Sequence, residues 1–489
     1  MITLQPLDMM RILPEIVLSV FAVLIMVLEP FVRAGHKKLL GYLALLGVIA
    51  AGGASARLTS LLYSWPGMGP AFGGSIAADE FSSFFIGLFM FVAGIVILGS
   101  MDYLERDHHQ HGEFYALILM GTVGMCFMAA STDLIMIFLG LEISSIATYI
   151  LAGYRRNDYL CNEASLKYFL LGSFATAFLL YGIAFVYGLT GTTNLLGASV
   201  RLAASPQWTP LAHVALILMF VGLAFKLSAA PFQIWAPDVY QGAPAPVTAF
   251  MSVGPKAAAF AVLLRVFLGS FTSAGDFSFW ILWISAALTM CVGNLGALWQ
   301  PNIKRLLAYS SIAHAGYVLV GVAAGGQRGI SGVLYYLVAY ALMNVGAFIL
   351  IAYLAGADER LVKIDDYRGL ASSRPAVAAC LTVFFLSLAG FPTTAGFLGK
   401  FFIFRAAIHS HLIGLTILAL LNSVVSVYYY FRIIVAMYMN DDKKETADAV
   451  LPWSVRTVLA ICILGIFYLG LMPNDFMGLS TLAAMPLFK

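Results

Sequence analysis

Five ionisable side chains lie in stretches of sequence that are otherwise almost wholly apolar: Glu142, Lys226, Lys256, His314 and Lys400. An ionisable group at the centre of a bilayer costs about 2.5–3.5 kcal/mol on insertion scales, so such groups indicate either a function or tight pairing. A carboxylate, an imidazole and an amine can each take up and release a proton. These residues therefore predict movement of protons or charge across a membrane, and a network of static ion pairs is the alternative.

The composition places the chain in a membrane. Hydrophobic residues make up 61% of the 489 residues and charged residues only 10%, which leaves too little polar surface to cover a soluble globule. Apolar runs near the roughly 20 residues that cross the hydrocarbon recur along almost the whole chain. The predicted fold class is an all-α, polytopic membrane protein with about fourteen transmembrane helices. The predicted spans are 12–33, 38–58, 80–103, 113–130, 132–152, 164–188, 209–240, 245–270, 277–299, 304–324, 330–355, 376–408, 412–438 and 453–472.

The basic residues between these spans predict the orientation of the chain. One set of alternating loops holds Arg33, Lys37, Lys38, Arg106, Arg155, Arg156, Lys304, Arg305, Arg360, Lys363, Arg368, Arg374, Lys443, Lys444 and Arg456. The other set holds Arg11, Arg57, Arg201, Arg328 and Lys489. Because basic loops stay in the cytoplasm, the first set is predicted to face the cytoplasm and both termini to lie outside.

Two of the predicted spans, 209–240 and 376–408, are too long for one crossing and are interrupted near their centres. The first contains Ser-Ala-Ala-Pro231, and the second contains Gly-Phe-Pro392-Thr-Thr-Ala-Gly. Non-helical backbone at membrane depth is tolerated only where protein or a watery cavity satisfies it, and paired broken helices are typical of transport sites. We therefore predict two broken helices, with simple proline kinks as the alternative.

The two broken helices belong to two predicted units of five helices that start on opposite sides of the membrane. The broken helix is fourth in each unit, and the second helix carries Glu142 in one unit and His314 in the other. This is the pattern of an inverted repeat. The predicted parts are three N-terminal transmembrane helices (1–110), a first five-helix repeat (111–272), a second, inverted five-helix repeat (273–440) and a C-terminal transmembrane helix (441–489).

Lys226 and Glu142 form the predicted centre of the first repeat. Lys226 lies deep in its span with apolar residues beyond it, so it cannot easily reach the membrane surface. Burial disfavours its ammonium form, whereas a nearby carboxylate such as Glu142 favours it. A lysine balanced between these effects can load and release a proton. A structural salt bridge between the two residues is the alternative, although it is a costly way to join helices in lipid.

The other candidates lie further along the chain. Lys256 follows Pro255, where we predict a local break in helical hydrogen bonding that gives the ammonium room and water. Lys400 follows the second broken segment, and for both lysines proton relay is preferred to packing. His314 titrates near neutral pH as a free side chain, which suits proton transfer, but a lone buried histidine is often only hydrogen-bonded to a neighbouring helix.

Lys167 and Lys304 lie near the cytoplasmic ends of their predicted spans. Each is a candidate for the entrance of the proton path or for the relay, and each could equally extend its ammonium to the membrane surface. The five cysteines are scattered singly, so no metal site, iron–sulfur cluster or disulfide is predicted. No phosphate loop or dinucleotide fingerprint is present, and the net charge of +3 does not suggest nucleic acid. The energy for charge movement must come from a partner subunit or a second ion gradient.

Glu142, Lys167, Lys226, Lys256 and Lys400, spaced along broken helices, resemble the functional residues of the antiporter-like subunits of respiratory complex I. Three segments sharpen the resemblance to the bacterial subunit N family of NADH-quinone oxidoreductase, over essentially the whole chain. They are Lys167-Tyr-Phe-Leu-Leu-Gly-Ser-Phe-Ala-Thr-Ala, Phe232-Gln-Ile-Trp-Ala-Pro-Asp-Val-Tyr-Gln-Gly-Ala-Pro-Ala-Pro-Val247 and Lys304-Arg-Leu-Leu-Ala-Tyr-Ser-Ser-Ile-Ala-His-Ala-Gly-Tyr317.

Sibling families fit less well. Subunit M-like chains usually have a glutamate where this chain has Lys400, and subunit L-like chains continue into a long lateral helix. The large subunits of sodium/proton antiporters typically carry Trp-Leu-Pro-Asp-Ala-His where this chain has Trp235-Ala-Pro-Asp-Val-Tyr-Gln241. A sodium site would also want carboxylates and carbonyls at mid-depth, where this chain has lysines. A subunit of a multisubunit monovalent cation/proton antiporter remains the alternative function, and a purely structural scaffold is a third.

The resemblance implies a proton path of two half-channels joined at the centre of the membrane. Glu142 would tune Lys226, and protons would pass from Lys226 by Lys256 and His314 to Lys400, driven by quinone reduction in neighbouring subunits. The chain itself would hold no cofactor, because FMN, the iron–sulfur clusters and the quinone site would belong to those partners. The partners implied are the other complex I membrane subunits and lipids, and the implied location is the bacterial inner (plasma) membrane.

Overall fold

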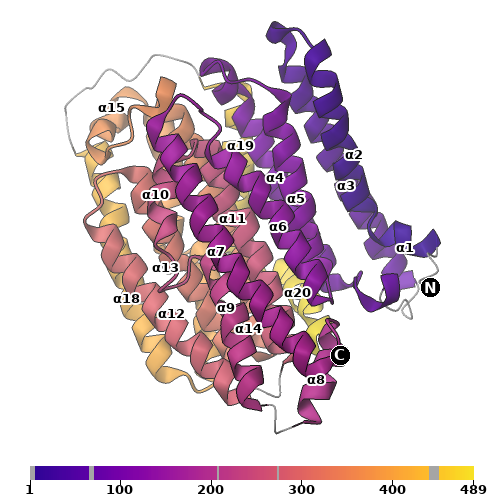
Figure 1. Ribbon diagram of the computed structural model, residues 1–489. Helices are drawn as coiled ribbons and strands as arrows, with labels where there is room; N and C mark the ends of the chain where they lie inside the picture. The colour runs from indigo at the N-terminus through magenta and orange to yellow at the C-terminus, as the bar shows by residue number, and fades with distance from the viewer. Residues whose placement is uncertain (1–5, 65–70, 206–208, 272–274, 440–450, 489) are drawn as a thin grey trace.

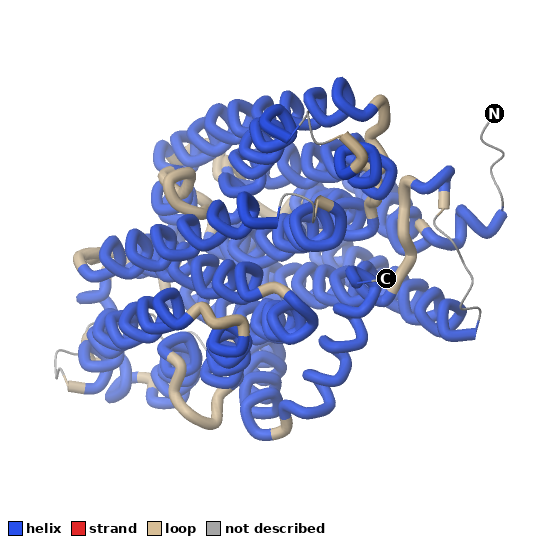
Figure 2. The backbone as a smooth tube through the Cα atoms, turned by 90° about the horizontal axis from the view of Figure 1, so that it is seen from below, coloured by secondary structure: helices blue, strands red, loops and turns tan. Residues whose placement is uncertain are grey.

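The computed structural model describes residues 6–64, 71–205, 209–271, 275–439 and 451–488. Within these ranges the regular structure is helical, apart from isolated β-bridges between loops. Figure 1 shows a single bundle of helices with α2 and α3 at one edge and α18 at the other, and Figure 2 shows it from below. The predicted loop residues Lys443, Lys444 and Lys489 lie outside the described ranges.

The helices of the first half of the chain are α1 (Pro6–Arg11), α2 (Leu13–Leu28), α3 (Lys38–Ser64), α4 (Glu80–Arg106), α5 (Gly112–Ala130), α6 (Leu134–Ala152), α7 (Tyr159–Thr190), α8 (Leu195–Ala203), α9 (Thr209–Leu227), α10 (Trp235–Gly242) and α11 (Ala245–Leu263), which continues as the π-helix η5 (Leu264–Ser270). Those of the second half are α12 (Gly275–Leu298), α13 (Ile303–Ala324), α14 (Gly326–Leu354), α15 (Leu370–Ser373), α16 (Pro375–Ala389), α17 (Ala395–His409), α18 (Ile413–Tyr438), α19 (Trp453–Leu471) and α20 (Pro473–Ala484). Short 3-10 turns connect several of them.

Thirteen of the described helices are long and apolar enough to cross a membrane. The shorter α16 and α17 together supply a further crossing in two halves, which agrees with the fourteen predicted spans. Helices are expected here because, in lipid, a helix satisfies its own backbone hydrogen bonds. The centre of the bundle is formed by α11, α13 and α14, whose apolar windows are 100%, 89% and 89% buried, whereas α2 is only 28% buried.

Hydrogen bonds between helix ends show which loops lie together on each of the two faces of the bundle. Glu359, in the turn after α14, accepts hydrogen bonds from Tyr103 near the end of α4, from Lys304 at the start of α13 and from the Ala245 N–H at the start of α11. We call this side the basic face. On the opposite face, Arg265 near the end of the α11 crossing pairs with the N-cap residue of α4, Asp79.

The assignment of helix ends to these two faces also gives the direction of the two five-helix units. α5 starts on the basic face, since Arg265 on the opposite face also donates to the Ala129 carbonyl at the far end of α5. α12 ends on the basic face, where Arg432 of α18 donates to the Leu298 carbonyl beside the start of α13. The first unit therefore begins on the basic face and the second on the opposite face, as an inverted repeat requires.

Both predicted broken helices are present. The first divides into α9 and α10, and the Phe225 carbonyl near the end of α9 accepts hydrogen bonds from the Ser228 N–H at 3.0 Å and from the Trp235 indole N–H at 2.8 Å. The second divides into α16 and α17 after Gly390, which adopts the left-handed conformation at φ 92°. Gly396 then packs so closely that a Cβ there would lie 1.9 Å from the Ser387 carbonyl oxygen.

The break predicted at Pro255 is not observed, because α11 continues through this residue. Proline removes only one backbone donor from the helix. All residues of α11 are buried, and the adjacent Gly254 packs tightly against Met125 of α5, where a Cβ would lie 2.8 Å from the sulfur. Packing on every side therefore holds α11 continuous where an isolated helix would kink.

Candidate functional site

Lys226 is the next-to-last residue of α9, and aromatic side chains surround its ammonium. The side chain is buried, and Nζ donates a hydrogen bond of 3.4 Å to the Tyr149 hydroxyl on α6. The ring centres of Tyr149 and Tyr168 each lie 4.9 Å from Nζ. Ring faces attract a cation by about 2 kcal/mol or more when the pair is desolvated. The break after Leu227 ends the helix here and leaves the lysine at the junction.

Glu142 lies on α6, two turns before Tyr149. It attracts Lys226 electrostatically, but a direct ion pair between them is not among those of the described residues, and the lysine bonds to Tyr149 instead. One carboxylate oxygen of Glu142, Oε1, is buried without a hydrogen-bond partner among the described residues. Because an unpaired buried carboxylate oxygen is costly, Glu142 differs from the paired carboxylate of a static salt bridge.

Lys256 is buried on α11 at the centre of the bundle. Its Nζ donates a 2.5 Å hydrogen bond to the Ser311 hydroxyl on α13, and the Tyr240 ring of α10 lies 5.6 Å away. The ammonium thus bridges toward the second unit, although no break in α11 makes room for it. Ser311 begins a polar face on α13 that continues at His314 and Tyr317, with the spacing of successive helical turns.

His314 is buried between two tyrosines from neighbouring helices. Its Nδ1 shares a hydrogen bond with the Tyr336 hydroxyl on α14, and its Nε2 shares one of 3.0 Å with the Tyr430 hydroxyl on α18. Tyr430 also bonds to Ser310, one residue before Ser311. The hydroxyl groups around His314 therefore lie beside the partner of Lys256.

Lys400 is buried on α17 and reaches back across the second break. Its Nζ donates to the Leu388 and Ala389 carbonyls at the end of α16 and to the Ser423 hydroxyl on α18, each at 3.1 Å. The Tyr317 ring of α13 lies 5.0 Å from Nζ. The end of a helix leaves its last carbonyls unpaired and carries partial negative charge, so it stabilises an ammonium. The second break thus creates the binding site for this lysine.

Lys304 forms a buried ion pair on the basic face. Its Nζ lies 2.5 Å from Glu359, and the two side chains are only 1% and 3% exposed. Burial by itself raises the pKa of Glu359, but the positive charges of Lys304 and Arg155, together with hydrogen bonds from Lys304 and the Ala245 N–H, hold the pKa below the ordinary glutamate value. Lys304 is therefore tied to a partner and does not extend to the surface.

Lys167 lies near the same face and is also paired. Its Nζ is 2.6 Å from Glu163 in the same helix and 2.7 Å from Asp238 on α10. Asp238 in turn pairs with Arg305 of α13 at 2.5 Å. This partly exposed cluster joins α7, α10 and α13 beside the first broken helix, at the place where a path from the basic face toward Lys226 would begin.

The site includes hydroxyl groups that sequence reasoning did not single out as functional. Tyr149, Tyr336 and Tyr430 contact the titratable residues directly, as do Ser311 and Ser423. Ser311 is the exception, because the sequence places it near His314 on the same helix, where we expect it to hold water. The three tyrosines gave no signal, because the chain has many aromatic residues. Within the described ranges, no cluster of three or more His, Cys, Asp or Glu residues could hold a metal ion.

These observations define a class of protein. The bundle has two broken crossings in units of opposite direction, and its interior holds lysines and a histidine, each hydrogen-bonded to a hydroxyl group. This is the architecture of an antiporter-like membrane subunit. Residues 131–426 match the family model described as NADH:quinone oxidoreductase/Mrp antiporter, TM, and the chain belongs to this family.

Known proteins of the family align over almost the full length of the chain. NADH-quinone oxidoreductase subunit N 1 of Solibacter usitatus is 49% identical, with 98% of both chains covered. NADH-quinone oxidoreductase subunit N of Trichlorobacter lovleyi is 45% identical, with 96% of both covered. A chain of respiratory complex I from Thermus thermophilus, solved with bound aureothin, is 36% identical at a TM-score of 0.79, with 96% of this chain and 99% of that chain covered.

Proposed function

We propose that this chain is the proton-translocating subunit N of a bacterial NADH-quinone oxidoreductase. The full-length relatives with that name support the assignment. The observation that carries it is the buried row of lysines and a histidine across the centre of the bundle, from Lys226 to Lys400. As a subunit of that enzyme the chain takes part in its catalysis, although its own residues offer proton transfer and no redox chemistry.

The proposed relay has two half-paths. Protons enter from the basic face near the cluster of Lys167 and reach Lys226, whose charge is balanced by Glu142. They continue by Lys256 to His314 and Lys400 and leave on the opposite face. The contacts of Lys256 with Ser311 and of His314 with Tyr336 and Tyr430 support the second part of this route.

The orientation and the partners complete the proposal. The positive-inside rule favours a cytoplasmic basic face, with both termini on the periplasmic side of the bacterial inner membrane. The other complex I membrane subunits would flank this chain, and FMN, the iron–sulfur clusters and the quinone site would lie in partner subunits. The free energy of quinone reduction would reach the relay through those contacts.

The experiment that tests this function separates pumping from assembly. Lys226→Ala and Glu142→Ala are made in the complete complex, which is reconstituted in proteoliposomes and assayed for NADH oxidation and NADH-driven acidification. Arg456→Ala, which removes an exposed charge from α19, is the matched control. We expect assembly to remain largely intact in all three variants and pumping to be impaired only in the first two. Normal pumping with normal assembly in both relay variants would contradict the proposal.

The second candidate is a subunit of a multisubunit monovalent cation/proton antiporter. The family model includes such proteins, and a chain of the Mrp complex from Dietzia has a TM-score of 0.85 over 99% of this chain and 98% of its own, but at 20% identity this shows the shared fold alone. Gentle purification of the tagged chain from native membranes separates the two cases. Co-purifying flavin, iron–sulfur absorbance and NADH:quinone activity favour the first, whereas cation/proton exchange without a redox signal favours the second.

A further inference from the structure

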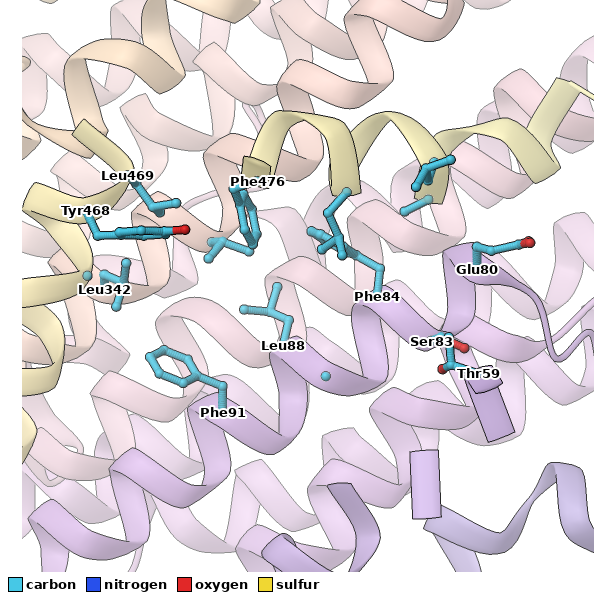
Figure 3. Close-up of a pocket in the computed structure, with 16 residues that line it drawn as sticks. Thr59, Glu80, Ser83, Phe84, Leu88, Phe91, Leu342, Tyr468, Leu469 and Phe476 are labelled. Atoms are coloured by element: carbon cyan, nitrogen blue, oxygen red, sulfur yellow. The ribbon is translucent and has the colours of Figure 1, made fainter. Parts of the chain in front are cut away.

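A groove of about 530 Å³ lies between helices from the two ends of the chain. Figure 3 shows Phe84, Leu88 and Phe91 of α4 facing Tyr468 of α19 and Phe476 of α20, with α14 also contributing to the wall. Between its two ends the groove is lined almost entirely by apolar side chains. It takes no part in the proposed relay, whose residues lie elsewhere in the bundle.

The length of the groove matches one membrane leaflet. Its wall on α4 runs from Glu80 to Phe91, which at about 1.5 Å per residue is roughly 16 Å along the helix. Half of a hydrocarbon core of about 30 Å is about 15 Å. Because α4 starts on the opposite face, the groove runs from that surface to the centre of the membrane. A single acyl chain of that leaflet has this extent and this polarity.

The polar side chains of the groove gather at its surface end. Thr59, Glu80 and Ser83 lie together there, and the Glu80 carboxylate points away from the apolar lining (Figure 3). Glu80 has no ion-pair partner among the described residues, since the nearby Arg265 is engaged by Asp79. The mouth therefore offers a negative charge beside two hydroxyl groups, which suits a headgroup with an ammonium and repels one with net negative charge.

We propose that the groove is a specific site for an amine-bearing phospholipid of the phosphatidylethanolamine type. One acyl chain lies between α4 and α20 and ends near Tyr468. The ammonium pairs with Glu80, and the Ser83 hydroxyl donates to the phosphate or ester oxygens. Bound in this way, the lipid joins the N-terminal helices to the C-terminal pair α19 and α20.

Gly87 provides a direct test, because it lines the groove and a Cβ added there meets no atom within 4 Å. Gly87→Leu therefore fills the groove without displacing a neighbour, and leucine is also the better helix former. Gly188→Leu on α7 is the matched control, since its Cβ also meets nothing within 4 Å and it does not line the groove. Glu80→Gln tests the headgroup separately and leaves the groove open.

The measurement uses the complete complex, extracted in mild detergent, washed, and exposed to vesicles of phosphatidylethanolamine mixed with phosphatidylglycerol. Native mass spectrometry and lipid extraction then identify the retained species. We expect the wild type and Gly188→Leu to retain the amine lipid and Gly87→Leu to lose it. Glu80→Gln should lower the preference for the amine lipid about two- to fivefold, as for an exposed ion pair.

Several results would overturn the proposal. One is equal lipid retention by Gly87→Leu and Gly188→Leu, and another is an unchanged headgroup preference in Glu80→Gln. A quinone, or a helix of a partner subunit, found cross-linked in the groove would also refute it. If Gly87→Leu fails to assemble, Glu80→Gln alone decides, because it changes one partly exposed side chain without adding an atom to the groove.

Discussion

The buried pair of Lys304 and Glu359 is expected to hold helices together rather than to carry protons. Replacing Glu359 by glutamine keeps the shape of the side chain but leaves the Lys304 ammonium buried without its counter-charge, with the Ala243 carbonyl as its remaining hydrogen-bond acceptor among the described residues. Breaking a buried pair in this way costs about 3–5 kcal/mol. Lys304→Met leaves the carboxylate unpaired and should cost a similar amount.

The double variant separates the energy of the pair from that of its surroundings. In Lys304→Met/Glu359→Gln neither charge of the pair remains, and the glutamine oxygen can still accept from the Ala245 N–H and the Tyr103 hydroxyl, which lie 2.6 and 2.8 Å from the native carboxylate. We therefore expect the double variant to be more stable than the sum of the single changes by about 2–3 kcal/mol.

The assay is the rate of heat inactivation of the purified complex, together with the amount of the chain in membranes. A difference of about 3 kcal/mol corresponds to roughly a 150-fold change in rate as an upper limit, reached if the contact is lost in the transition state. The pH dependence gives a second readout. Because the pKa of Glu359 is lower when folded than when unfolded, its stabilisation is complete above about pH 4.3 and is lost as the pH falls through the folded value. Glu359→Gln should abolish that dependence.

Two outcomes would refute this reasoning. If both single variants matched the wild type in stability, the pair would not hold the helices. If the double variant recovered stability but lost proton pumping while NADH oxidation continued, Lys304 would belong to the relay itself. Recovery of both properties would establish the pair as a static contact.

Further variants test the remaining parts of the site. Lys226→Arg keeps a charge that effectively never deprotonates, so pumping should fall at least tenfold while assembly remains normal, as measured in proteoliposomes. Lys400→Met should reduce thermal stability by about 2–4 kcal/mol because it orphans two carbonyls, whereas Lys226→Met should cost less in the same melting assay. Gly396→Ala should prevent stable assembly, judged by native gel, because its Cβ would lie 1.9 Å from a backbone oxygen. Arg265→Met should lower the amount of chain in membranes several-fold, since it leaves Asp79 without its partner.

Much of the architecture follows from hydrophobic length and from the position of glycine and proline. The two long spans had to be interrupted because neither fits one crossing, and Pro231 and the segment around Pro392 placed both interruptions correctly. Proline also predicted a break at Pro255, and that prediction is wrong, because a helix that is buried on every side tolerates the loss of one backbone donor. The sequence shows where a helix is weakened, whereas the surrounding packing decides whether it breaks.

The titratable residues could be found from the sequence because charge is rare in lipid, but their partners could not. Glu359 lies in a polar turn where an acidic residue is unremarkable, and only the fold brings it against Lys304 from a helix more than fifty residues away. Arg265 lies near the end of its predicted span, where the sequence does not reveal that it is buried and paired with Asp79. Contacts between residues that are far apart in the sequence can be identified only from the three-dimensional structure.

The two breaks differ in which groups donate to the carbonyls at the helix end, and this difference bears on the direction of proton transfer. Each leaves carbonyl groups at the end of a helix that need a donor. In the first break the Ser228 N–H and the Trp235 indole donate to the Phe225 carbonyl, so Lys226 is free to face Tyr149 and Tyr168 and is attracted by Glu142. In the second, Lys400 is itself the donor to both carbonyls. Removing a proton from Lys400 thus removes the positive charge that the carbonyl end of α16 attracts and leaves two N–H donors for three contacts, whereas among the described residues Lys226 makes no such contact with the end of its helix. We therefore expect protonation of Lys400 to be coupled to the geometry between α16 and α17, so that in the proposed relay a conformational change in this half of the bundle would control the release of protons.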